Sequence, residues 1–121
     1  MNLFRWGAFT SAAGLELPFK IECHVLDGAD WYCIARQAKA SLPPFSFPVS
    51  VPRGGDMLAR ALATMGTGRS TDLPLIVDDV WTTGMSMMRI VYERQYNEWL
   101  GYVAFARGEL PPNVKCFMRL G

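Results

Sequence analysis

The chain has 121 residues, half of them hydrophobic and only 19% charged, with a formal net charge of +1. This composition is too apolar for a disordered protein, and the length suits one folded unit, so we expect a single domain over residues 1–121. The near-zero net charge gives no basis for binding nucleic acid or a membrane surface. The three cysteines, Cys23, Cys33 and Cys116, are odd in number and widely spaced, which favours a reducing cytoplasm over a disulfide framework or metal cluster.

Residues 1–19 contain one early arginine and no uninterrupted apolar run, so we expect no signal peptide. No stretch of the chain approaches the roughly 18 apolar residues that a membrane-spanning helix requires. We therefore expect a soluble protein of the cytoplasm.

Apolar patterns along the first part of the chain predict a strand followed by a helix. Residues 19–26 alternate in polarity, which is typical of a strand. Asp27 and Asp30 are candidate N-caps for a helix over residues 31–42, which Pro43 and the next proline end.

The remaining elements follow from the same patterns. Residues 45–52 form a predicted strand that Pro48 confines to an edge or a start. We expect a helix up to Gly66, a buried strand over 73–77, a second helix, and closing strands over 101–106 and 114–120. The second helix is expected to carry one apolar face, made of Met88, Val91, Tyr92, Gln95 and Trp99.

The alternation of strands and helices predicts an α/β fold with a mainly parallel sheet flanked by helices. In such sheets ligands bind beyond the carboxyl ends of the strands. Two loops are expected at that edge, PRGG at residues 52–55 and DDVWTTGMS at residues 78–86. Their convergence is the first indication of a functional site.

The second loop has the composition of a phosphate cup. Gly84 can adopt backbone conformations closed to other residues and lets a ligand approach the main chain. The amides that open the following helix are unpaired donors, reinforced by the helix dipole. Three hydroxyls add to these donors, those of Thr82, Thr83 and Ser86.

Two adjacent acids, Asp78 and Asp79, precede this cup. Carboxylates do not bind phosphate, but they accept hydrogen bonds from sugar hydroxyls or hold a hydrated Mg²⁺. A cup beside paired acids suits a sugar phosphate. The alternative is an ordinary capped turn with Trp81 merely packed, which explains neither the adjacent acids nor the cluster of hydroxyls.

The stretch LIVDDVWTTGMSM closely resembles the phosphoribosyl-pyrophosphate (PRPP) signature of the type I phosphoribosyltransferases. The resemblance implies that Asp78 and Asp79 engage the ribose hydroxyls and act on Mg²⁺ indirectly, through water or the ribose. It also implies that the turn wraps the 5′-phosphate. The turn residues concerned are Thr82, Thr83, Gly84, Met85 and Ser86.

The stretch VSVPRGGDMLARAL resembles the pyrophosphate-binding loop of the same family. Arg53 would bind the pyrophosphate oxygens, while Gly54 and Gly55 allow close backbone approach. Family members often have a cis peptide here, so the bond from Pro52 to Arg53 is a candidate. Taken alone, the loop could equally be a plain turn with a solvated arginine.

The N-terminal stretch FTSAAGLELPFKIEC resembles the hood of orotate phosphoribosyltransferases, which implies a hood over residues 1–26 and a core over 45–121. The residues that match are Phe9, Thr10, Gly14, Pro18 and Phe19. Phe19 is expected either to stack on a base or to pack in the core. Lys20 and Arg107 are expected either to meet an anionic base or to be solvated surface charges.

Two departures from the orotate enzymes concern catalysis. Ala12 stands where their hood usually has a lysine, and only residues 67–72 link the first core helix to the buried strand. That link is too short for their mobile, lysine-rich catalytic loop, and Arg69 is its only basic residue. Because closing lids exclude water, the site is expected either to stay open or to be covered by a partner chain.

These observations predict a phosphoribosyltransferase that transfers ribose 5-phosphate from PRPP to a nitrogenous base and releases pyrophosphate, with Mg²⁺ as cofactor. Asp78, Asp79 and Arg53 are the expected catalytic residues. The alternative is a non-catalytic PRPP- or nucleotide-binding module, and a third possibility is a subunit whose site is completed in trans. The family favours a homodimer, and the hood favours a pyrimidine such as orotate without fixing the base.

Overall fold

The computed structural model of the protein describes residues 3–10 and 16–120, and between residues 4 and 20 it describes only the backbone. Two strands, β1 (Phe4–Thr10) and β2 (Glu16–Ile21), pair antiparallel as a separate small sheet. The remaining elements are a 3-10 helix η1 (Cys23–Val25), α1 (Gly28–Ser41), β3 (Phe45–Ser50), α2 (Asp56–Leu62), β4 (Leu73–Trp81), α3 (Met85–Arg94), β5 (Leu100–Ala106) and β6 (Val114–Arg119).

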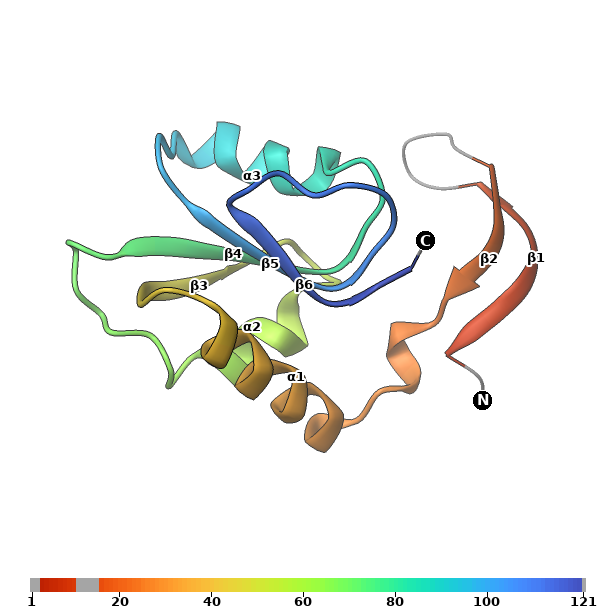
Figure 1. Cartoon of the computed structure of the whole chain (residues 1–121), viewed down its shortest axis with the longest axis horizontal. Helices are drawn as coiled ribbons and strands as arrows, with labels where there is room; N and C mark the ends of the chain where they lie inside the picture. The colour runs from red at the N-terminus through yellow and green to blue at the C-terminus, as the bar shows by residue number, and fades with distance from the viewer. Residues whose placement is uncertain (1–2, 11–15, 121) are drawn as a thin grey trace.

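The main sheet has the order β3-β4-β5-β6, and every neighbouring pair is parallel. Helices α1 and α2 cover one face and α3 covers the other, while the β1–β2 hairpin stands beside the sheet (Figure 1). The predicted α/β class is confirmed. Strand β3 lies at an edge, as Pro48 requires, because proline cannot donate to a sheet ladder.

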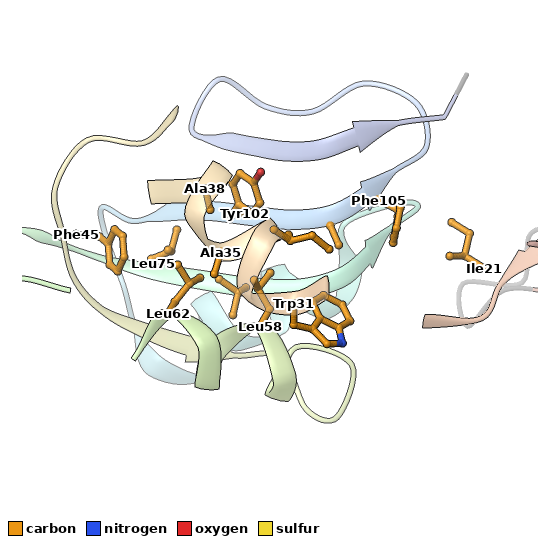
Figure 2. Packing of buried hydrophobic residues seen from close by; sticks show 13 residues of the cluster. Ile21, Trp31, Ala35, Ala38, Phe45, Leu58, Leu62, Leu75, Tyr102 and Phe105 are labelled. Carbon is orange, nitrogen blue, oxygen red and sulfur yellow. The ribbon is translucent and has the colours of Figure 1, made fainter. Parts of the chain in front are cut away.

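The two faces of β4 bury two apolar clusters, because successive side chains of a strand alternate between faces. Leu75 and Val77 join the cluster beneath α1 and α2, whereas Ile76 joins the cluster beneath α3. Figure 2 shows the first cluster, with Phe45 at one end and Phe105 and Ile21 at the other. Ile21 belongs to β2, so this cluster also attaches the hairpin to the main sheet.

Helix α1 begins at Gly28 rather than at the predicted residue 31, because its N-cap is Asp27. Asp27 Oδ1 accepts from the Asp30 amide at 2.9 Å, and Asp30 Oδ2 accepts from the Asp27 amide at 3.0 Å. This reciprocal pair is a capping box, which satisfies amides that the first helical turn leaves without partners. Both acids therefore contribute to one cap.

The predicted strand over residues 19–26 is wrong beyond Ile21. The chain instead turns into η1, where the amides of Val25 and Leu26 donate to the carbonyls of Glu22 and Cys23. Cys23 and Leu26 both pack against the cluster under α1 and α2, a three-residue spacing that suits a helical turn. An alternating pattern this short does not distinguish the two conformations.

The predicted apolar face of α3 is confirmed at Val91 and wrong at its other positions. Met87 and Val91 are its buried residues, whereas Tyr92 is 85% exposed and Met88 is 47% exposed. The helix ends before Gln95, which adopts a left-handed conformation with φ of 57°, so Trp99 lies outside it. The turn at its start fixes the rotation of the helix, which the pattern alone did not reveal.

Strand β4 runs four residues beyond the predicted end at 77, so that Asp78 and Asp79 lie within it. Among the described helices, none is long and apolar enough to cross a bilayer.

Leu58 has no exposed surface and lies at the centre of the cluster under α1 and α2, whereas its neighbour Met57 is 39% exposed. We expect Leu58→Ala to lower the free energy of unfolding by about 2 to 5 kcal/mol, since it leaves a cavity in a packed core. Met57→Ala on the same helix is the matched control, with an expected loss of about 0.5 kcal/mol. Urea denaturation measures both, and equal losses would contradict the assigned face of α2.

Candidate functional site

The loop that joins β3 to α2 folds back onto β4. The Val51 amide donates to the Val77 carbonyl at 2.8 Å, and the Gly55 amide donates to the Val51 carbonyl at 2.8 Å. A Cβ on Gly55 would overlap the Val77 carbonyl oxygen, so the loop can approach this closely only with glycine there. The two loops predicted to converge at the carboxyl edge of the sheet are therefore in contact.

Gly54 brings this loop against one of the paired acids. A Cβ on Gly54 would overlap the carboxylate of Asp79, and the nearest atom is Asp79 Oδ1. The same Oδ1 accepts a hydrogen bond from the Val80 amide at 2.7 Å. The predicted cis bond between Pro52 and Arg53 is present, and the Arg53 side chain is exposed at the tip of the loop.

The turn after β4 has the shape expected of a cup. Gly84 adopts φ of +80°, the left-handed region that favours glycine, and precedes the first residue of α3. A Cβ at this position would also collide with the ring of Trp81, which is only 8% exposed. Trp81 thus packs directly under the turn and supports it.

A pocket of about 160 Å³ opens at this turn. All five predicted cup residues line it, namely Thr82, Thr83, Gly84, Met85 and Ser86. The remaining lining residues are Asp78, Val80, Trp81, Met87 and Arg89. Asp78 is the only acid among them and Arg89 the only base.

The sequence interpretation missed Arg89. It lies four residues after Met85, and residues four apart share one face of a helix. That spacing was the available signal, since it places Arg89 on the same side of α3 as the cup.

Asp78 is buried, with 8% of its surface exposed, and its Oδ1 accepts from the Asp79 amide at 2.8 Å. Burial, reinforced by the neighbouring Asp79 carboxylate, raises the pKa of Asp78 to about 8. Asp78 follows Ile76 on the α3 face of β4, and Asp79 follows Val77 on the α2 face. Asp78 thus lines the cup, and Asp79 contacts the loop between β3 and α2.

The segment that joins the hairpin to α1 also reaches the acids, which the sequence interpretation did not predict. The Cys23 thiol is hydrogen bonded to Asp79, and burial together with the nearby carboxylates raises the thiol pKa. Glu22 is buried and its Oε2 lies 3.1 Å from Nδ1 of His24, which is exposed. A protonated thiol acts here as a hydrogen-bond donor to the site and not as a nucleophile.

Arg107 follows β5 at the same edge of the sheet. Its amide donates to the Trp81 carbonyl at 2.9 Å, and partial burial lowers the pKa of its guanidinium. The remaining predicted contacts to a base fall on the hairpin. Phe9, Thr10, Pro18, Phe19 and Lys20 lie in β1 and β2, but their side chains lie outside the described residues, as do Ala12 and Gly14 entirely.

The link between α2 and β4 is short and tied down at the opposite edge of the sheet. The amides of Thr67 and Gly68 donate to the carbonyls of Phe45 and Ser46, near the start of β3. Asp72 accepts from Thr67 Oγ1 at 2.6 Å and from Arg69 Nε at 3.1 Å. Arg69 is therefore held away from the cup, and this link does not form a lid.

Comparison with known proteins gives a match in structure alone, since no protein-family model and no curated protein matches the sequence. Orotate phosphoribosyltransferase from Aeropyrum pernix aligns over 98% of this chain and 88% of its own, with 19% identity and a TM-score of 0.68. The enzyme of the same name from Mycobacterium tuberculosis aligns over 96% of this chain and 88% of its own, with 17% identity and a TM-score of 0.68.

Leishmania donovani UMP synthase aligns with a TM-score of 0.75 and 17% identity, over 98% of this chain but only 34% of the synthase. At these identities the likeness concerns the fold. The parallel sheet, the two loops at its carboxyl edge and the small hairpin beside it all take part in that likeness. The chain therefore has a fold like that of the type I phosphoribosyltransferases.

Proposed function

We propose that the protein binds PRPP at the carboxyl edge of its sheet and transfers ribose 5-phosphate to a nitrogenous base, releasing pyrophosphate. The observation that carries this proposal is the contact between the two loops. The Gly54 backbone lies against the Asp79 carboxylate, while Asp78 lines the cup beyond it. The loop proposed for pyrophosphate, the acids proposed for ribose and the cup proposed for the 5′-phosphate thus follow one another in the order in which PRPP carries these groups.

Each part of the site has a distinct role in this reaction. The cup binds the 5′-phosphate through amides and hydroxyls, and the acids accept hydrogen bonds from the ribose hydroxyls. As pyrophosphate leaves, positive charge develops on the ribose ring, and the Asp79 carboxylate beside the ring would stabilise that charge. Exposed Arg53 is free to neutralise the departing pyrophosphate.

The donor set fits Mg²⁺ bound indirectly. In the described residues no three acids, histidines or cysteines converge to hold a metal ion. Mg²⁺ typically binds proteins through one or two carboxylates while keeping waters and substrate phosphates, so Asp78 and Asp79 would hold it through water or the ribose. When bound, Mg²⁺ would neutralise charge on the pyrophosphate.

The acceptor base is expected between the hairpin and the end of β5. Arg107 lies at that edge, and a guanidinium there favours an anionic base. The structural neighbours include orotate phosphoribosyltransferases, which supports an orotate-like pyrimidine.

A specific observation favours a second candidate, a PRPP-binding module without catalytic activity. The link between α2 and β4 is hydrogen bonded at the far edge of the sheet and does not close over the site. A site that admits water during the reaction loses much of the electrostatic stabilisation that catalysis needs. Alternatively, a second copy of the chain would supply the cover.

Titration calorimetry with PRPP and Mg²⁺, alongside a pyrophosphate-release assay with a panel of bases including orotate, separates the two candidates. We expect PRPP binding, and release with at least one base. We expect Asp79→Asn to weaken PRPP binding about tenfold or more, because it removes a charged hydrogen-bond acceptor. We expect Asp78→Asn to weaken it less, because Asp78 already carries a proton near pH 7. Tight binding without release would leave only the binding module, and binding unchanged in the double variant would overturn both.

The contact between Gly54 and Asp79 provides a separate test of the site. In Gly54→Ala the added methyl group displaces the Asp79 carboxylate, so we expect PRPP affinity to fall about tenfold. Gly28→Ala is the matched control, because a Cβ at Gly28 meets nothing within 4 Å. Calorimetry measures the affinities and urea denaturation measures folding. Equal affinities of the two variants would contradict a ligand beside Asp79.

The raised pKa of Asp78 has a consequence for stability. The folded state holds this proton up to about pH 8, whereas an unfolded aspartate loses it near pH 4, so the contribution of Asp78 to stability declines as pH rises through that window. Asparagine does not ionise. We therefore expect Asp78→Asn to gain stability relative to wild type between pH 5 and pH 9, measured by urea denaturation.

Asp72→Asn is the control for this measurement, since the hydrogen bond from Thr67 lowers the pKa of Asp72. Both states of Asp72 are then ionised from pH 5 upward, and its difference from wild type stays constant. A constant difference for Asp78→Asn over the same range would show that Asp78 is not protonated in the folded state.

A further inference from the structure

We propose that Arg89 is a phosphate-binding residue that makes the cup selective for a ligand with a doubly charged terminal phosphate. The inference rests on the proposed function, since it concerns the subsite that the 5′-phosphate of PRPP would occupy. Arg89 would add a cationic side chain to a cup whose other binding groups are backbone amides and hydroxyls.

The position of Arg89 is the first argument. Helical side chains lean towards the N-terminus of their helix, so a residue in the second turn of α3 reaches back over the first. Arg89 lines the same pocket as Ser86 and Met85, which lie three and four residues before it. Its guanidinium can therefore meet a group held at the mouth of the helix.

The second argument is that Arg89 has no partner within the described part of the chain. Glu93 follows it by four residues, a spacing at which ion pairs form on helices, yet no ion pair joins the two side chains. Neither does any other described acid engage the Arg89 guanidinium. The Arg89 guanidinium at the pocket can therefore pair with an anionic ligand.

The charge balance of the pocket is the third argument. Asp78 is the only acidic lining residue, and it is buried, whereas Arg89 is exposed at the pocket. Arg89 is the only cationic side chain in the lining, and the helix dipole has the same sign. A planar guanidinium binds two phosphate oxygens at once, which favours a terminal phosphate over a neutral sugar.

The experiment is titration calorimetry of ribose 5-phosphate, and of ribose as the uncharged probe, into wild type, Arg89→Gln, Arg89→Lys and Arg94→Gln. Arg94 is the matched control because it is an exposed arginine on the same helix that does not line the pocket. We expect Arg89→Gln to weaken ribose 5-phosphate binding about tenfold, and Arg89→Lys to weaken it less. We expect Arg94→Gln to bind within about twofold of wild type.

A second measurement distinguishes a direct contact from a general effect of charge. Removing a cation that contacts phosphate should make the affinity for ribose 5-phosphate depend less on salt concentration. The affinity for ribose should be the same in Arg89→Gln as in wild type. Unchanged affinity in Arg89→Gln, or an equal loss in Arg94→Gln, would overturn the inference while leaving PRPP binding intact. A wild type that binds neither ribose 5-phosphate nor PRPP would overturn the proposed function, and this inference with it.

Discussion

The site depends on a carboxyl group held out of water at the end of a parallel strand. Asp78 is buried because β4 continues past its apolar run and carries both acids into the sheet, next to β5. A buried carboxylate is costly unless it is compensated, and Asp78 meets this cost by retaining its proton and accepting one backbone hydrogen bond. The same extension of β4 also positions the loop between β3 and α2 and the turn before α3.

Strand alternation then divides the two acids between two partners. Asp78 faces the α3 side and lines the cup, whereas Asp79 faces the α2 side and meets Gly54 and Cys23. Side chains of adjacent strand residues point to opposite faces, so Asp78 reaches the cup while Asp79 reaches the Gly54 loop. The two acids are adjacent in the sequence because each serves a different loop from the same strand.

The sequence predicted the fold class, the edge position of β3, the cis bond before Arg53 and the five cup residues. The cis bond was implied by the resemblance to the pyrophosphate-binding loop, whereas the others follow from local features such as a glycine turn, a proline in a strand and an apolar run. The rotation of α3 was not predictable in the same way, because Gly84 and the ring of Trp81 set where the helix starts. Arg89 was overlooked although its four-residue spacing from Met85 was visible, and Cys23 was overlooked because a short alternating pattern does not distinguish a strand from a helical turn.

The distribution of hydrogen bonds around the sheet bears on how the site could be closed. The link between α2 and β4 uses its polar groups at the amino edge, where Thr67, Arg69 and Asp72 bond to one another. A segment held this way would have to break those bonds before it could move. The hairpin is placed differently, since Ile21 at its end packs in the cluster under α1 and α2 (Figure 2), and Cys23 in the following turn contacts Asp79. The linker after the hairpin and the Gly54 loop therefore both contact Asp79, whereas the link between α2 and β4 lies at the other edge of the sheet.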